Sequence, residues 1–262
     1  MTTLGITSYT YRWAVSGGHL DARGLIERVA GNGLGLLQFL DNLPIENLSD
    51  DDLRALGEHA RNRGVALMVG MSGLDPTLLR RQIEVARIVG AGQLRATVVG
   101  GVAAAEATIR DVLPALREDG ITLALENHSD ATSDDLAGLV RRIGDPRVAV
   151  CLDFLNSIAL LEGPGETVGK LAPFAASVHL KDGVVGKAGT GWRIVGTALG
   201  DGQVDLPKLL DVVWATGGRP PLLFEMWQDR LADEAATLAA EDEWVARSVA
   251  CLKRLAARAP SA

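Results

Sequence analysis

ITLALE, residues 121–126, is a run of apolar residues that ends in a single acid, Glu126. The same pattern returns three times later in the chain, where an apolar run closes on or next to one acid or histidine: VAVCLD (148–153) with Asp153, ASVHL (176–180) with His179, and PLLFE (221–225) with Glu225. Short apolar runs of this kind are typical of buried strands. Because the carboxyl ends of parallel strands in a barrel meet at one mouth, we expect these four side chains to lie together.

Strand-like runs also precede these four, and the first seven runs start roughly 25 to 32 residues apart, which is the length of one strand, one helix and two loops. The earlier runs are LGITSY (4–9), LGLLQF (34–39), VALMVG (65–70) and LRATVVG (94–100). Between the runs lie stretches of helical period with capping signals, such as Asp75-Pro76 before a helix and Gly90 after it. The pattern predicts a single-domain α/β fold over residues 1–262, a (β/α)₈ TIM barrel, for which about 250 residues is usual. The rival is a doubly wound open sheet, but no GxGxxG turn follows the first strand.

The composition excludes several classes of protein. The chain has 47% hydrophobic and 23% charged residues and a formal net charge of −7, which disfavours a nucleic-acid binder. No apolar run is long enough for a membrane span, and no charged-then-apolar leader opens the chain, so a cytoplasmic location and no membrane partner are expected. Cys151 and Cys251 are 100 residues apart and are expected to be reduced core thiols.

The four strand-end residues together suggest a metal site. Three buried carboxylates without compensation would each cost several kcal/mol or take up protons. A divalent cation removes that cost, and carboxylates with an imidazole suit Mn²⁺, Mg²⁺, Co²⁺ or Zn²⁺. The alternative is that each residue is an unrelated loop residue or helix cap, which is common for one such residue and rare for four in register.

The segments LALENHSD (123–130), VCLDFLNS (150–157), VHLKDG (178–183) and LFEMW (223–227) resemble the xylose-isomerase-like TIM-barrel superfamily, in its sugar isomerase and epimerase branch. The resemblance implies that Glu126, Asp153, His179 and Glu225 bind one divalent cation, with Mn²⁺ first among the candidates. It also implies that Glu126 and Glu225 carry protons on opposite faces of a sugar or sugar-acid substrate. Such an enzyme would isomerise or epimerise a hydroxy-ketone through an enediolate, whose charge the cation stabilises.

Two other functions remain open at this point. A lyase could use the same site, by dehydration, decarboxylation or elimination from a 3-keto glycoside, if the enediolate loses a group. A non-catalytic sugar-binding subunit is the third alternative. The departures from the family bear on this choice: ketose 3-epimerases have a histidine where this chain has Asn156, and an arginine shortly after the strand-7 histidine, where this chain has Lys181.

Further residues are expected to contact the substrate. Strand alternation places Lys181 on the same side as His179, and His128 on the same side as Glu126. The alternatives are a solvated loop lysine for Lys181 and a loop-capping role for His128. Aromatic residues at the catalytic end could form the walls of a partly apolar pocket: Trp13, Trp192 and Trp227. Asn156 is also expected to contact the substrate, and Arg193 could bind an anionic group. Arg95 could bind an anionic group, or could lie near the start of its strand and pair with a helix acid.

The interval between His179 and Glu225 is 46 residues, against 27 and 26 for the two before it. The excess is a glycine-rich stretch at about 182–204, expected to be a long loop over the catalytic face. Whether it is a mobile lid or a rigid rim is open, as is assembly into a homo-oligomer.

Overall fold

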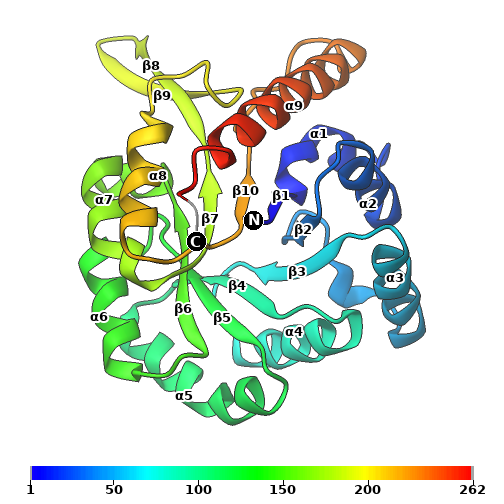
Figure 1. Cartoon of the computed structure of the whole chain (residues 1–262), viewed down its shortest axis with the longest axis vertical. Coiled ribbons are helices and arrows are strands. Elements are labelled where there is room, and N and C mark those ends of the chain that lie inside the picture. The colour runs from blue at the N-terminus through cyan, green and yellow to red at the C-terminus, as the bar shows by residue number, and fades with distance from the viewer. Residues whose placement is uncertain (1, 261–262) are drawn as a thin grey trace.

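The computed structural model describes residues 2–260, and its centre is the predicted barrel (Figure 1). Among these residues, eight parallel strands close in the order β1-β10-β7-β6-β5-β4-β3-β2, because β1 pairs with both β2 and β10. The fold prediction is therefore confirmed. The barrel strands are β1 (Leu4–Thr7), β2 (Leu36–Phe39), β3 (Ala66–Met71), β4 (Gln93–Thr97), β5 (Thr122–Glu126), β6 (Val148–Asp153), β7 (Ala175–Leu180) and β10 (Leu222–Phe224).

Helices alternate with the strands and surround the barrel (Figure 1). Asp75 caps α4 by accepting N–H bonds from Thr77 and Leu78, and Gly90 ends that helix at φ +79°, as the sequence predicts. The helices are α1 (Arg12–Ser16), α2 (Ala22–Gly31), α3 (Asp50–Asn62), α4 (Pro76–Val89), α5 (Val102–Glu118), α6 (Ser133–Ile143), α7 (Pro164–Leu171), α8 (Leu206–Ala215) and α9 (Glu234–Ala256). Short 3₁₀ turns lie at 8–11, 45–47, 156–160 and 172–174. None of the described helices is both long and apolar enough to cross a bilayer.

The large hydrophobic core lies between the strands and the helices, where Leu25, Leu53, Leu79 and Leu136 are fully buried. A second small cluster of Leu36, Met68 and Leu223 lies inside the barrel. Two residues farther along two of these strands, alternation places polar side chains, Gln38 and Glu225, on the same inward face. The barrel interior thus changes from apolar to charged toward the carboxyl ends of the strands, and this gradient positions the site.

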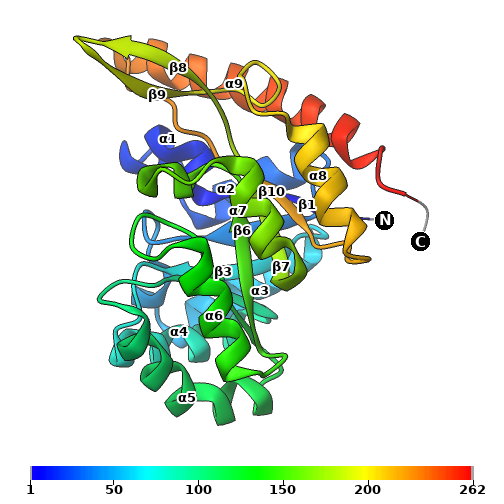
Figure 2. The same cartoon turned by 90° about the vertical axis from the view of Figure 1, so that its left-hand side faces the viewer.

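The glycine-rich stretch after β7 forms an antiparallel hairpin, β8 (Asp182–Ala188) and β9 (Gly191–Thr197), which projects from the barrel (Figure 2). The sequence suggested an irregular loop here. Paired β-branched residues explain the difference, because Val184 faces Val195 and Val185 faces Ile194 across the two strands. The glycines between them mask that alternation in the sequence.

Candidate active site

The four predicted strand-end residues lie together at the mouth of the barrel. The Nδ1 atom of His179 is 3.0 Å from Glu126 Oε1, 3.8 Å from Glu225 Oε2 and 4.0 Å from Asp153 Oδ2. All four side chains are buried. Adjacent strands produce this convergence: Asp153 on β6 is in register with His179 on β7, and Glu225 directly follows β10.

Two fixed cations share the cluster. The Nζ atom of Lys181 is 2.6 Å from Glu225 Oε1 and 3.1 Å from Asp153 Oδ2, and it donates a 2.9 Å hydrogen bond to Asn156 Oδ1. Arg95 forms an ion pair with Glu126. Both cations are buried inside the barrel. Lys181 is thus not a solvated loop lysine, and Arg95 does not pair with a helix acid.

These cations correct the charge argument made from the sequence. The three carboxylates are not uncompensated, because Arg95 and Lys181 supply two positive charges against their three negative ones. The sum is −1 with His179 neutral, which is the form in which an imidazole binds a metal. Without a metal, burial acts to lower the pKa of His179 but Cys151 and Glu126 raise it well above its usual value, and a protonated imidazole brings the sum to zero. A divalent cation bound to the neutral imidazole would therefore bring the cluster to +1.

Neutral groups hold the carboxylates in fixed orientations. Asp153 Oδ1 accepts backbone N–H bonds from Leu155 (2.8 Å) and Asn156 (2.7 Å), and Thr7 Oγ1 donates to Glu225 Oε2 at 3.0 Å. Asn156 Nδ2 donates to Glu126 Oε1 at 3.2 Å. Because Asn156 Oδ1 also accepts from Lys181, Asn156 connects the Arg95–Glu126 pair to Lys181 and its carboxylates. With these partners, each carboxylate keeps one oxygen on the side of His179.

Sequence reasoning missed Thr7, Gln38 and Asn127. Gln38 Oε1 is 2.7 Å from His179 Nε2, and Asn127 holds β6 by bonding to the backbone N–H and carbonyl of Asp153 at 2.8 Å each. A signal for Gln38 was present, because it is a lone amide in the apolar run LGLLQF.

The pKa values of the cluster follow from burial and these ion pairs. Burial alone would raise the pKa of Glu126, but the Arg95 guanidinium and His179 hold it below its usual range. Burial also acts to raise the pKa of Glu225, which Lys181 and His179 lower overall. For Asp153 burial dominates, so its pKa is raised despite Lys181. Burial would lower the pKa of Lys181, but the surrounding carboxylates, Asp153 first, raise it.

The donor set fits a divalent cation. Ligand bonds of about 2.0–2.2 Å place two donors of one ion about 3 to 4.4 Å apart. The three distances from His179 Nδ1 to the carboxylate oxygens, 3.0, 3.8 and 4.0 Å, fall in this interval. Among the described residues, the group whose ligand atoms all lie within 4.8 Å of one another is Glu126, Cys151 and His179. Asp153 and Glu225 approach His179 but do not complete such a group with their present side-chain positions. Both cysteines are free and buried, as the sequence predicts.

A cavity of about 510 Å³ adjoins the cluster and brings together five of the predicted substrate-contacting residues: His128, Asn156, Trp192, Arg193 and Trp227. It shares Asn156 with the charged cluster, and the Trp227 ring lies 4.8 Å from Lys181 Nζ. Two residues that line this cavity are largely in solvent: Trp192 on the hairpin is 71% exposed and Leu161 is 94% exposed. Leu161 also has a left-handed backbone, with φ +62°.

Trp13 does not line this cavity. Its Nε1 donates to the backbone carbonyl of Gln228 at 3.0 Å, and the Arg12 guanidinium lies 5.0 Å from its ring. These contacts fix the β10–α9 connection to α1. A direct role of Trp13 in substrate binding stays a prediction.

Comparison with known proteins gives relatives over nearly the whole chain. A protein from Pectobacterium atrosepticum, 3-oxo-isoapionate decarboxylase, is 28% identical over 256 residues, which cover 94% of this chain and 93% of the relative. Two solved structures resemble the fold alone. One is a xylose isomerase-like TIM barrel protein from Mycobacterium smegmatis in complex with magnesium (16% identity, TM-score 0.72, 96% and 98% of the two chains). The other is a D-psicose 3-epimerase from Clostridium cellulolyticum H10 (14%, 0.73, 99% and 99%).

The profile of the family described as xylose isomerase-like TIM barrel matches residues 26–255. That range includes the four converging residues and seven of the barrel strands. The chain therefore belongs to the xylose isomerase-like TIM barrel family.

Proposed function

We propose that this chain is a sugar-acid lyase that decarboxylates a 3-oxo sugar acid. The observation that carries the proposal is the pair of buried cations, Arg95 and Lys181, on the carboxylates of Glu126, Asp153 and Glu225. The full-length likeness to a 3-oxo-isoapionate decarboxylase supports it.

Proton transfer separates this reaction from epimerisation. Epimerisation needs two carboxylates that alternately take and give a proton, and such groups work best with pKa values near the operating pH. Here each of the two candidate proton carriers is held in a buried ion pair, Glu126 with Arg95 and Glu225 with Lys181. Decarboxylation removes no proton from carbon, so it tolerates carboxylates held in the charged state.

The charge of the cluster favours an anionic substrate. With a divalent ion bound, the described charges sum to +1, which a substrate carboxylate brings to zero. Without Arg95 and Lys181, the metal-bound cluster would carry a charge of −1 and would repel the carboxylate of the substrate. We therefore expect a keto acid to bind better than a neutral ketose of equal size.

The reaction balances without a further reagent. The bond between the carboxylate carbon and the carbon next to the ketone breaks, its electron pair moves onto the ketone oxygen, and CO₂ leaves. The resulting enolate takes one proton from solvent on carbon and becomes the shortened ketose. Buried positive charge near the ketone oxygen lowers the barrier, because it stabilises the anion as it forms.

Glu126, Asp153, His179 and Glu225 would hold the divalent cation, with Mn²⁺ first among the candidates, and when bound it supplies Lewis-acid stabilisation of that oxyanion. The other residues of the cluster have separate roles. Lys181 pairs with Asp153 and Glu225, Arg95 pairs with Glu126, and Asn156 bonds to both Lys181 and Glu126. The cavity of Trp192 and Trp227 holds the rest of the sugar.

Isotope-resolved NMR tests the proposal. The protein with Mn²⁺ is incubated in D₂O with a 3-oxo pentonate labelled with ¹³C at its carboxylate, and with a panel of ketoses. We expect labelled bicarbonate and one deuterium in the shortened ketose. Deuterium exchange into ketoses without loss of carbon would instead show an isomerase or epimerase, and binding without either change would show a sugar-binding protein.

A further inference from the structure

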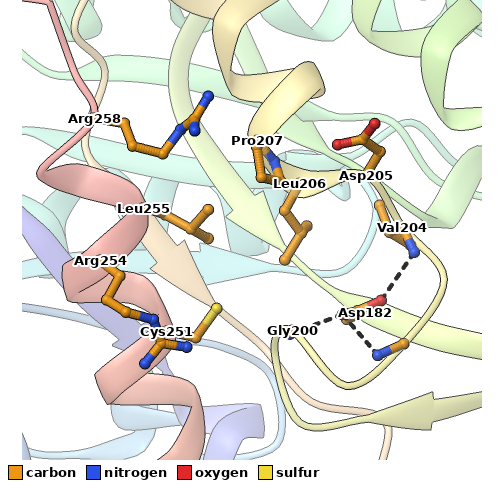
Figure 3. Close-up of a pocket in the computed structure, with 11 residues that line it drawn as sticks. Asp182, Gly200, Val204, Asp205, Leu206, Pro207, Cys251, Arg254, Leu255 and Arg258 are labelled. Carbon is orange, nitrogen blue, oxygen red and sulfur yellow. Dashed lines mark hydrogen bonds between the residues drawn. The ribbon is translucent and has the colours of Figure 1, made fainter.

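Asp182 directly follows Lys181, and its buried carboxylate points to the segment of Gly200 and Val204 (Figure 3). Strand alternation places the two neighbouring side chains on opposite sides of the backbone. It accepts four hydrogen bonds from described backbone amides. Oδ1 receives Gly183 at 2.8 Å and Val204 at 3.2 Å, and Oδ2 receives Gly200 at 2.8 Å and Gly202 at 3.0 Å. Backbone dipoles thus stabilise this buried anion in place of a cationic side chain.

Two glycines make this arrangement possible. Gly200 has φ +89°, a conformation that other residues rarely adopt, and a side-chain carbon at Gly202 would overlap the carboxylate of Asp182. The segment between them is thereby wrapped around one side chain. We call Asp182 and its amide partners in residues 200–204 the Asp182 clamp.

The clamp joins the base of the hairpin to the segment that enters α8. Asp182 pairs with Thr197 in the hairpin register. Gln203 makes two hydrogen bonds to β8: its backbone N–H donates to the carbonyl of Gly183 at 2.8 Å, and its Oε1 accepts from the N–H of Val185 at 2.9 Å. On the other side of the same backbone, Leu180 is held by the 3.1 Å bond from the Glu225 N–H. Lys181 is the residue between these two anchors.

We propose that Asp182 is a positioning residue that fixes the backbone at Lys181, and so keeps the ammonium group between Asp153 and Glu225. A lysine side chain is flexible, so its placement depends on where its Cα is held. Removing the clamp frees the backbone on one side of Lys181, and the same change releases the base of the hairpin. Asp182 would thus fix both the position of the Lys181 ammonium and the base of the hairpin, although its own carboxylate contacts neither the substrate nor the reacting atoms.

Asp182→Asn tests this with almost no change in shape. The amide NH₂ would face backbone N–H groups that now donate to Oδ2 or Oδ1, and two donors cannot bond to each other. Gly202→Ala breaks the clamp from the opposite side. Asp201→Asn is the matched control, since Asp201 lies in the same segment but is paired at the surface with Arg247.

The readout is the accessibility of Lys181, measured by a short pulse of acetic anhydride on the full chain and mass spectrometry. We expect both clamp variants to raise the labelling rate at Lys181 by about tenfold, as local opening does. Labelling of Lys170 on α7 and the melting temperature should change little, and Asp201→Asn should match the wild type. Unchanged protection of Lys181 in both clamp variants, or a uniform rise at every lysine, would overturn the proposal.

A kinetic arm rests on the proposed function, whereas the labelling arm does not. If Asp182 acts through Lys181, adding Asp182→Asn to Lys181→Ala should not lower kcat further. A multiplicative loss in the double variant would contradict a role through Lys181. If no 3-oxo acid is turned over at all, the labelling result still decides the positioning role.

Discussion

The charged cluster at the barrel mouth and the projecting hairpin beside it are built in opposite ways. In the cluster, Lys181 directs its ammonium at three acceptors, and each carboxylate has at least one fixed partner. On the hairpin, Trp192 and Val185 are more than half exposed, and Arg193 forms an exposed ion pair with Asp229 at 3.0 Å. From this difference we expect the reaction chemistry to depend on rigid, desolvated charges, and the choice of substrate to depend on an exposed rim that has room to adapt.

The largest effect should come from breaking the cluster at Lys181. We expect Lys181→Met to lower kcat strongly and to lower the free energy of unfolding by about 3–5 kcal/mol, because Asp153 and Glu225 lose their buried counter-charge. Urea unfolding measures this. Lys187→Met on the exposed hairpin is the control and should change stability by less than about 0.5 kcal/mol.

The second prediction tests the metal ligands in the same cluster. Asp153→Ala or His179→Ala should abolish the gain in unfolding free energy that Mn²⁺ gives, which is about 2.7 kcal/mol at one hundred times the dissociation constant. Metal per chain after dialysis and melting with and without Mn²⁺ are the measurements. Full metal occupancy in either variant would remove that residue from the ligand set. The variant Cys151→Ser tests whether the thiol of Cys151 contributes to metal binding.

The third prediction concerns the rim. Trp192→Ala should raise KM or lower kcat several-fold while the unfolding free energy stays within about 0.5 kcal/mol, because the side chain is largely in solvent. Trp214→Ala provides the contrast, since Trp214 is 3% exposed and its truncation should cost about 3–5 kcal/mol. Normal kinetics in the Trp192 variant would exclude both a lid and a substrate wall at this position.

The smallest effect is expected at Leu161. A left-handed backbone costs a leucine about 1–2 kcal/mol and an asparagine less, and this side chain is 94% exposed. Leu161→Asn should therefore stabilise the fold by up to about 1 kcal/mol. Thermal melting checks the sign, and the neighbouring Leu160→Asn, which lacks the positive φ, should not stabilise.

Local sequence patterns were enough to predict the barrel and the convergence of four residues. Each strand is a short apolar run, and a polar residue at its end can be assigned to the mouth once the strands are known to be parallel. Glu126, Asp153, His179 and Glu225 were placed together in this way, before any contact was known.

The electrostatic state of the site could not be predicted in this way. Arg95 stands in the middle of an apolar run, and only the register of β4 against β5 brings it onto Glu126. The bond between Asn156 and Lys181 likewise depends on the three-dimensional course of two loops. The hairpin was missed because its glycines interrupt the alternation by which a strand is recognised.

The closure of the barrel between its first and last strands has a consequence for how the protein is made. Thr7 holds Glu225 across 218 residues of sequence, and β1 has no partner on one side until β10 exists. On the ribosome, residues 126 to 181 therefore emerge before Glu225 is present to pair with Lys181, and the seam stays open until β10 at residues 222–224 has been made. A nascent chain at that stage exposes two unpaired strand edges, the state in which a chaperone would recognise it.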